Sequence, residues 1–141
     1  MGPRSRHVPV VIPDVADLAP FARCSRAELD RIRALLTPVL LPIDATIIEH
    51  GTPPRQFAVI ADGEVAVEER NGRELAVLGP GSIVGELGLL RDTPTGATVR
   101  TLTPVALYVG NRWEFRAMLE AAPTVDAYVL HVALERTRTA G

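Results

Sequence analysis

Short strand-like runs fill the middle of this chain, and turn-forming residues close each of them. The runs cover residues 39–41, 46–48, 57–60, 65–67 and 75–78, and the β pattern resumes at 98–102 and 105–109. Strands repeating every eight to twelve or so residues, with Gly, Pro or Asn between them, are typical of an antiparallel barrel or sandwich. Asn71-Gly72 predicts a tight hairpin between 65–69 and 74–78.

Helical patterns flank these strands. Ser25 and Glu28 have the spacing of a capping box, and apolar residues follow at helical intervals, so we expect a helix over 25–36 that ends before Pro38. Asn111 is a suitable cap for a second helix over 112–121.

Pro123 separates that helix from a third, expected over 124–138. Its apolar stripe comprises Val125, Tyr128, Val129 and Val132, and its opposite face carries Asp126, Glu135 and Arg136. The stripe can pack on the chain's own strands or pair with a second copy in a homodimer through 124–138.

Composition limits the function classes. A chain of 141 residues with net charge −2 suits one globular domain. Nucleic-acid binding usually requires a cluster of basic residues on one face, and this charge balance gives no reason to expect one. Four prolines before residue 21 predict an extended lead-in over 1–17, with the domain proper over 18–141. Cys24 is the one cysteine, and no apolar run approaches the roughly 20 residues of a membrane span. We therefore expect a cytoplasmic protein without membrane contact.

The segment from Gly79 to Val99 carries the strongest functional signal. Strand-like Ile83-Val84 runs into Gly85-Glu86-Leu87-Gly88, and a turn-rich stretch then leads to Ala97-Thr98-Val99. Such a segment exposes consecutive backbone N–H groups around a small concave space with one carboxylate at its rim. A nest of amides of this kind suits an anion.

This segment resembles the phosphate-binding cassette of the cyclic-nucleotide-binding domain family, which includes catabolite-activator-like regulatory domains. Further similarities lie in the lead-in from Leu18, in the turn at Ile48-Glu49-His50-Gly51 and in the run 57–65, so the resemblance covers about 18–134. It implies a mixed β fold with flanking helices: an antiparallel, jelly-roll-like β-roll of about eight strands, one N-terminal helix and two C-terminal helices.

The resemblance also implies a ligand site. Glu86 occupies the position whose carboxylate accepts a hydrogen bond from the ribose 2′-hydroxyl in the family. Gly85, Leu87 and Gly88 supply the turn and the backbone N–H groups that the family offers to the cyclic phosphate. After the cassette's proline, Thr95 stands where the family has an arginine that pairs with the cyclic phosphate, and the amides of Gly96 and Ala97 follow. The ordinary alternatives are tight turns for the glycines and, for Glu86, a helix-start carboxylate that satisfies nearby amides.

Thr95 offers a neutral hydroxyl in place of a two-pronged guanidinium. Loss of a charged hydrogen bond of about 1.5–3 kcal/mol weakens binding by about tenfold to a hundredfold. Arg91 and Arg100 are the candidate compensating cations, although Arg100 has the pattern of an outward-facing, solvated strand residue.

The sequence lacks the residue patterns that metal-binding and catalytic sites require. A metal-binding cupin needs a His-x-His pair and a Glu on adjacent strands, whereas His7, His50 and His131 fall in the lead-in, a turn and the last helix. No metal site, paired-carboxylate site or Ser-His-Asp arrangement is recognisable. We therefore expect a non-enzyme without a cofactor.

Three functions remain open. The first is a regulatory domain that binds cAMP or cGMP, with cAMP favoured and affinity weakened, and signals through its last helices to a fused or partner effector domain. The second is a degenerate domain that serves as a protein-interaction or assembly module. The third is a sensor of another small anion or apolar ligand. Because the chain stops at Gly141, where the family's transcription factors continue into a helix-turn-helix, we expect no DNA contact by this polypeptide.

Overall fold

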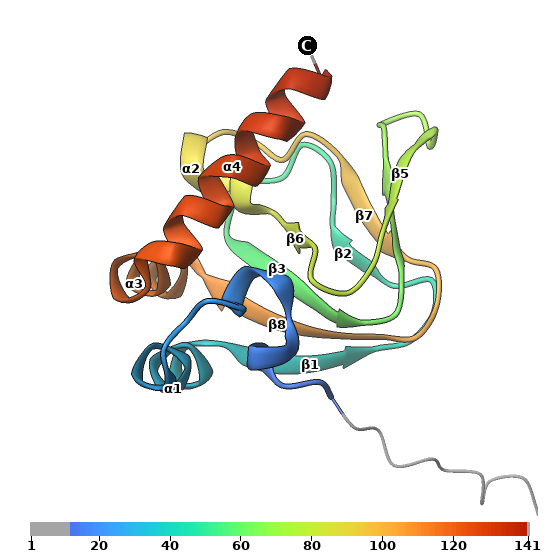
Figure 1. Cartoon of the computed structure of the whole chain (residues 1–141). Coiled ribbons are helices and arrows are strands. Elements are labelled where there is room, and N and C mark those ends of the chain that lie inside the picture. Colours follow the sequence, from blue (N-terminus) through green and yellow to red (C-terminus); the bar gives the residue numbers. More distant parts are fainter. Residues whose placement is uncertain (1–11, 141) are drawn as a thin grey trace, which may run out of the picture.

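A computed structural model describes the backbone of residues 12–140 and the side chains of residues 12–136 (Figure 1). Within them the chain forms, in order, η2 (Val15–Asp17), η3 (Ala19–Phe21), α1 (Arg26–Leu35), β1 (Thr37–Leu41), β2 (Thr46–Ile48), β3 (Gln56–Asp62), β4 (Val65–Glu68), β5 (Glu74–Leu78), β6 (Ile83–Val84), α2 (Glu86–Arg91), β7 (Thr98–Thr101), β8 (Val105–Asn111), α3 (Arg112–Ala121) and α4 (Pro123–Ala140).

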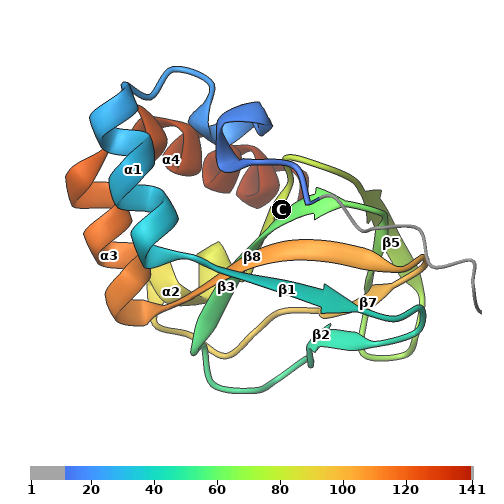
Figure 2. The ribbon, with the colours of Figure 1, turned by 90° about the horizontal axis from the view of Figure 1, so that it is seen from below.

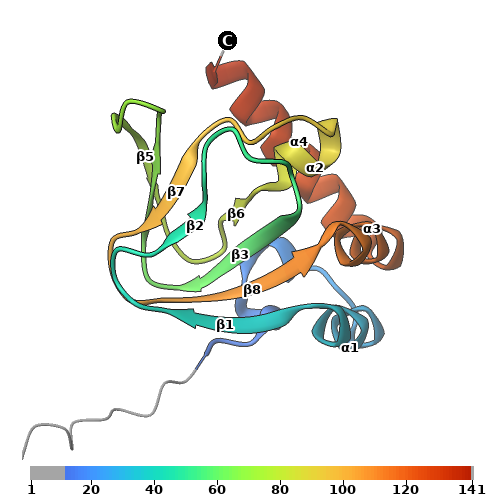
Figure 3. The same cartoon turned by 180° about the vertical axis from the view of Figure 1, so that it is seen from behind.

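The strands make two antiparallel sheets that wrap into a roll. One sheet has the order β1-β8-β3-β6 and the other has the order β2-β7-β4-β5. Figure 3 shows the two sheets facing each other, with α2 at one end of the space between them. The predicted antiparallel β-roll with one N-terminal and two C-terminal helices is confirmed.

Two apolar cores hold the fold together. The first lies inside the roll and includes Ile60, Val65, Val84 and Leu107, all at most 2% exposed. The second lies where α1, α3 and α4 cover the outer face of the first sheet (Figure 2), and Phe57 and Phe115 meet there with their ring centroids 4.9 Å apart. Because β3 contributes to both cores, it joins the roll to its helical cover.

Local sequence signals fix the element ends as predicted. The Ser25 hydroxyl accepts from the Glu28 N–H, and the Glu28 carboxylate accepts from the Ser25 N–H, which completes the capping box of α1. Asn111 and Glu114 form the same reciprocal pair at α3. Strands β4 and β5 form the predicted hairpin, in which Gly72 adopts a φ of 87°.

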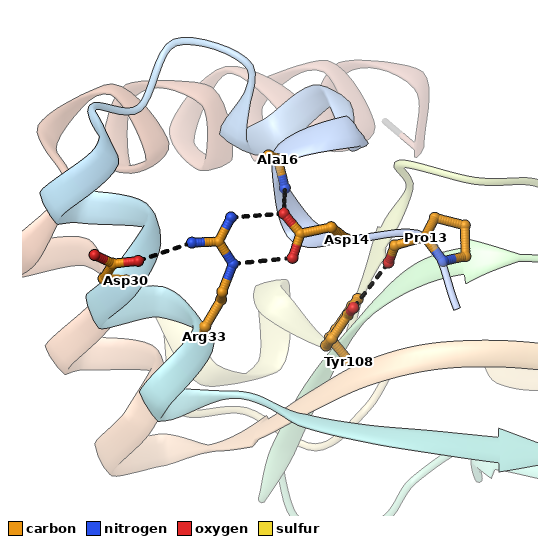
Figure 4. Close-up of polar contacts among 6 residues, drawn as sticks. All are labelled: Pro13, Asp14, Ala16, Asp30, Arg33 and Tyr108. Carbon is orange, nitrogen blue, oxygen red and sulfur yellow. Dashed lines mark hydrogen bonds and ion pairs between the residues drawn. The ribbon is translucent and has the colours of Figure 1, made fainter. Parts of the chain in front are cut away.

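The described part of the lead-in is anchored, where the sequence indicated an extended segment. Asp14 receives two hydrogen bonds from Arg33 of α1, at 2.9 and 2.6 Å, and the Tyr108 hydroxyl donates to the Pro13 carbonyl at 2.8 Å (Figure 4). The Arg33 guanidinium lowers the pKa of Asp14 to about 2. The ordered fold therefore starts before residue 18, with Val15 fully buried; residues 1–11, and His7 with them, lie outside the described residues.

The predicted apolar stripe of helix α4 packs against the rest of the same chain. Val125 and Val129 are fully buried in the core beneath the helices, and Tyr128 packs against it. Leu130 and Leu134 are the exposed large apolar residues of the described part of this helix, at 48% and 65%. Within residues 12–140, no helix combines the length and apolar character that crossing a membrane demands.

Candidate functional site

The cassette is built around two close backbone approaches. Gly85, between β6 and α2, has a φ of 86°, and a Cβ there would lie 2.6 Å from the Gln56 carbonyl oxygen. A Cβ at Gly88 would lie 2.9 Å from the Pro54 side chain. Glycine is therefore required at both positions for α2 to sit against the segment that enters β3.

Glu86 is the first residue of α2, and its side chain turns inward, leaving only 1% of the residue exposed. One nitrogen of Arg136, on α4, forms hydrogen bonds with both oxygens of this carboxylate. Nη1 donates to Oε1 at 2.8 Å and to Oε2 at 2.6 Å. The other terminal nitrogen, Nη2, donates to the Ile83 carbonyl at 2.5 Å. Figures 1 and 3 show why this pairing is reachable, since α4 passes directly beside α2.

Burial raises the pKa of the Glu86 carboxyl above its ordinary value, while the positive charge of Arg136 and the N–H groups of Glu86 and Leu87 oppose that rise. The Leu87 amide, expected to face a ligand phosphate, thus lies against the Glu86 carboxylate. The carboxylate end of the cassette is held by the protein's own charge.

Thr95, at the other end of the cassette, is hydrogen-bonded to the connection between β2 and β3. Its hydroxyl donates to the Glu49 carbonyl at 2.6 Å and accepts from the Thr52 N–H at 3.1 Å. Two backbone bonds flank it, from Gly51 N–H to the Thr95 carbonyl at 2.8 Å and from Thr95 N–H to the Thr52 carbonyl at 2.9 Å. We call this set, made by Glu49, Gly51, Thr52 and Thr95, the Thr95 clasp.

Beyond the clasp, Gly96 is exposed and borders an open hollow of about 360 Å³. We call it the hairpin hollow, because it is lined by the β4–β5 hairpin together with the β2–β3 connection and the cassette: His50, Glu69, Arg70, Asn71 and Gly96. An adjoining hollow of about 370 Å³ shares His50 and Arg70 with it. A separate hollow of about 580 Å³ is lined in part by Thr95 and Arg55.

The two arginines proposed as compensating cations lie elsewhere. Arg100 of β7 forms ion pairs with Asp44 and Glu68, both at 2.7 Å, as an outward-facing strand residue would. Arg91 is exposed at the end of α2 and lines none of these three hollows.

Sequence reasoning placed Arg136 on the polar face of its helix and did not single out Arg70. The partner of Arg136 lies 50 residues away in the chain, so no local spacing indicates it. Arg70 follows the charged pair Glu68-Glu69 near a hairpin turn, a pattern that is normally only solvated.

Known proteins are similar to this chain in sequence. The acetyltransferase Pat of Mycolicibacterium smegmatis is 33% identical over 82% of the chain, which covers 36% of that protein. A cyclic nucleotide-gated potassium channel of Mesorhizobium japonicum is 30% identical over 86% of the chain, which covers 34% of the channel. The chain thus spans about a third of the length of these two relatives.

A solved structure, the cAMP-binding acyltransferase from Mycobacterium smegmatis, superposes with a TM-score of 0.74 at 30% identity, over 89% of this chain and 40% of the other. The sequence profile described as the cyclic nucleotide-binding domain matches residues 38–122, from β1 through the end of α3. This chain therefore belongs to the cyclic nucleotide-binding domain family.

Proposed function

We propose that this chain is a non-enzymatic regulatory domain that senses a cyclic nucleotide, with cAMP as the favoured ligand, and passes its state to an effector through α4. The observation that carries the proposal is the ion pair between Glu86 and Arg136, since it ties the expected ribose-binding carboxylate directly to the C-terminal helix. The expected setting is the cytoplasm.

The pair gives the signal a physical route. A ribose hydroxyl that donates to Glu86 must share a carboxylate whose two oxygens already accept from Arg136 at 2.6 and 2.8 Å. Binding therefore changes the contact that holds α4 beside the cassette. A ligand shifts a two-state equilibrium only by its difference in affinity for the two states, and this contact supplies that difference.

The relatives support an effector supplied by another part of the protein or by a partner. One is an acetyltransferase and another is a gated channel, so similar domains accompany effectors of unlike chemistry. We propose the same relation for this chain. Leu130 and Leu134 form an exposed apolar strip on α4 where an effector or a second copy of the chain can pack.

The Thr95 clasp favours a second candidate function. Both hydrogen-bonding capacities of the Thr95 hydroxyl are used within the protein, so this end of the cassette keeps its shape without a ligand phosphate. A domain of this kind can act as a constitutive interaction or assembly module. The same neutral clasp also suits a sensor of a different small ligand.

Titration of the isotopically labelled domain with cAMP and cGMP, followed by amide chemical shifts, separates these functions. The sensor proposal expects the Gly85–Gly88 and Gly96–Ala97 amides to shift at micromolar ligand, together with the amides of α4. In Arg136→Gln the cassette shifts should persist while those of α4 fade, and the exposed Arg116→Gln should behave as the unaltered protein. Silence up to millimolar ligand contradicts sensing and supports the interaction module.

A further inference from the structure

The hairpin hollow joins three segments that are distant in sequence but meet at the phosphate end of the cassette. His50 comes from the β2–β3 connection, Arg70 from the β4–β5 hairpin, and Gly96 from the cassette itself. The volume of about 360 Å³ falls within the range of small-molecule sites. Two basic side chains, those of His50 and Arg70, therefore line the same hollow as Gly96.

Gly96 leaves the floor of this hollow open. A Cβ at this position would meet no atom within 4 Å, and the N–H groups of Gly96 and Ala97 donate to no backbone acceptor outside the strand ladders of residues 12–140. Backbone N–H groups without a backbone acceptor, next to an open hollow, are available donors for an anion.

Arg70 is the cation best placed to reach that anion. In the described part of the chain, Arg33, Arg100, Arg112 and Arg136 are held in ion pairs, whereas the Arg70 side chain forms none. Arg55 is also outside those pairs, but it lines the hollow beside Thr95, whose hydroxyl is already taken by the clasp. Only the hairpin hollow combines an unpaired guanidinium with the open backbone of Gly96 among these described hollows.

We propose that Arg70, assisted by His50, meets the phosphate of the ligand and replaces the arginine that Thr95 does not provide. This inference rests on the proposed function. The phosphate clamp would thus lie on the hairpin next to the cassette, where the long side chain of Arg70 lines the same hollow as Gly96. A guanidinium suits this task because it presents fixed, charge-assisted donors to phosphate oxygens.

The acidic neighbours set the ligand class. Glu69 lines the hairpin hollow, and Glu49 lines the adjoining hollow that shares His50 and Arg70. Two carboxylates beside one guanidinium repel a doubly charged phosphate monoester more than a singly charged phosphodiester. The hollow therefore favours a cyclic phosphodiester such as cAMP over adenosine 5′-monophosphate.

Calorimetric titration of the whole chain with cAMP, cGMP and adenosine 5′-monophosphate tests this assignment. Arg70→Gln should weaken cyclic-nucleotide binding by about tenfold or more and flatten its dependence on salt. Arg70→Lys should restore part of the affinity. Arg73→Gln, in the same hairpin but outside both hollows, is the matched control and should bind within about twofold of the unaltered protein.

The outcomes separate this inference from the proposed function. Cyclic-nucleotide binding that Arg70→Gln leaves unchanged overturns the role of Arg70 while keeping the sensor. A loss that appears with Arg55→Gln in its place also overturns it and moves the anion to the hollow beside Thr95. Preference for the monophosphate contradicts the charge argument. If the unaltered protein binds neither cyclic nucleotide, the proposed function fails and this inference fails with it.

Discussion

The two ends of the cassette have been stabilised in opposite ways. At one end a fully buried carboxylate, Glu86, is held by the charge of Arg136 from a distant helix. At the other end a neutral hydroxyl, Thr95, is held by backbone groups of a neighbouring turn. A buried charge requires a partner, so the Glu86 end is paired with Arg136 of α4, whereas the neutral Thr95 end is hydrogen-bonded to the connection between β2 and β3.

The largest effect should come from removing the partner of the buried charge. Arg136→Ala leaves Glu86 buried without its guanidinium, and we expect a loss of about 3 kcal/mol in the free energy of unfolding. This is the lower end for such pairs because 30% of the Arg136 side chain is exposed. Urea denaturation measures the loss, with the exposed Arg116→Ala as control. Equal stability of the two variants would remove the basis for coupling α4 to the cassette.

The next effect concerns the uncharged end of the cassette, at Thr95. Thr95→Arg should raise cAMP affinity at least about tenfold, because it restores a charge-assisted contact to the phosphate. The clasp is broken in this variant, so a modest loss of stability should accompany the gain. Calorimetry measures the affinity, and Thr93→Arg places the same cation at a nearby exposed position as control. No gain over that control would mean that the Thr95 end no longer borders a ligand cavity.

A smaller effect isolates the clasp itself. Thr95→Val keeps the shape of the side chain but removes the hydroxyl, which leaves the Thr52 N–H and the Glu49 carbonyl without this partner. We expect a loss of about 1 kcal/mol in thermal unfolding experiments, with ligand affinity unchanged. The exposed Thr93→Val should be nearly neutral. A fall in affinity without a fall in stability would show that the hydroxyl serves the ligand and not the turn.

The smallest effect is the dependence of stability on pH. Because the folded-state pKa of Glu86 is raised, its contribution to stability is complete below the unfolded pKa and declines as pH rises through the folded value. Glu86→Gln has no proton to lose. The stability of this variant relative to the unaltered protein should therefore improve as pH increases from about 4 to about 8. A difference that stays constant over this range would contradict the raised pKa.

Sequence patterns predicted the helix ends and the hairpin turn, which are set by hydrogen bonds between residues close in sequence. The capping box of α1, the Asn111 cap of α3 and the hairpin at Asn71-Gly72 depend on residues within a few positions of one another, and each formed as expected. The spacing of strands and turns predicted an antiparallel barrel or sandwich, and the resemblance to the family specified the roll. The prolines of the lead-in gave no sign of the long-range partners that Asp14 and Val15 find in the described part of that segment.

The site depended on pairings that no local pattern contains. Arg136 reaches Glu86 across 50 residues of sequence, and Thr95 reaches Thr52 across 43. A helical wheel assigns Arg136 to the solvent because it represents one helix alone, without the carboxylate that α2 brings beside it. Residue type and spacing identified where a ligand is expected, but only the folded chain shows which protein groups already occupy the carboxylate and the hydroxyl.

The coupling between cassette and helix is tested most directly by the distance between α4 and the roll. Spin labels at His131→Cys and Arg73→Cys, in a Cys24→Ser background, report that distance by pulsed electron paramagnetic resonance with and without cAMP. We predict that cAMP changes the distance distribution, and that Arg136→Gln abolishes the change while cAMP still binds. The four samples are the labelled protein and its Arg136→Gln variant, each without cAMP and with cAMP at a saturating concentration. Identical distance distributions in all four would contradict signalling through the Glu86–Arg136 pair.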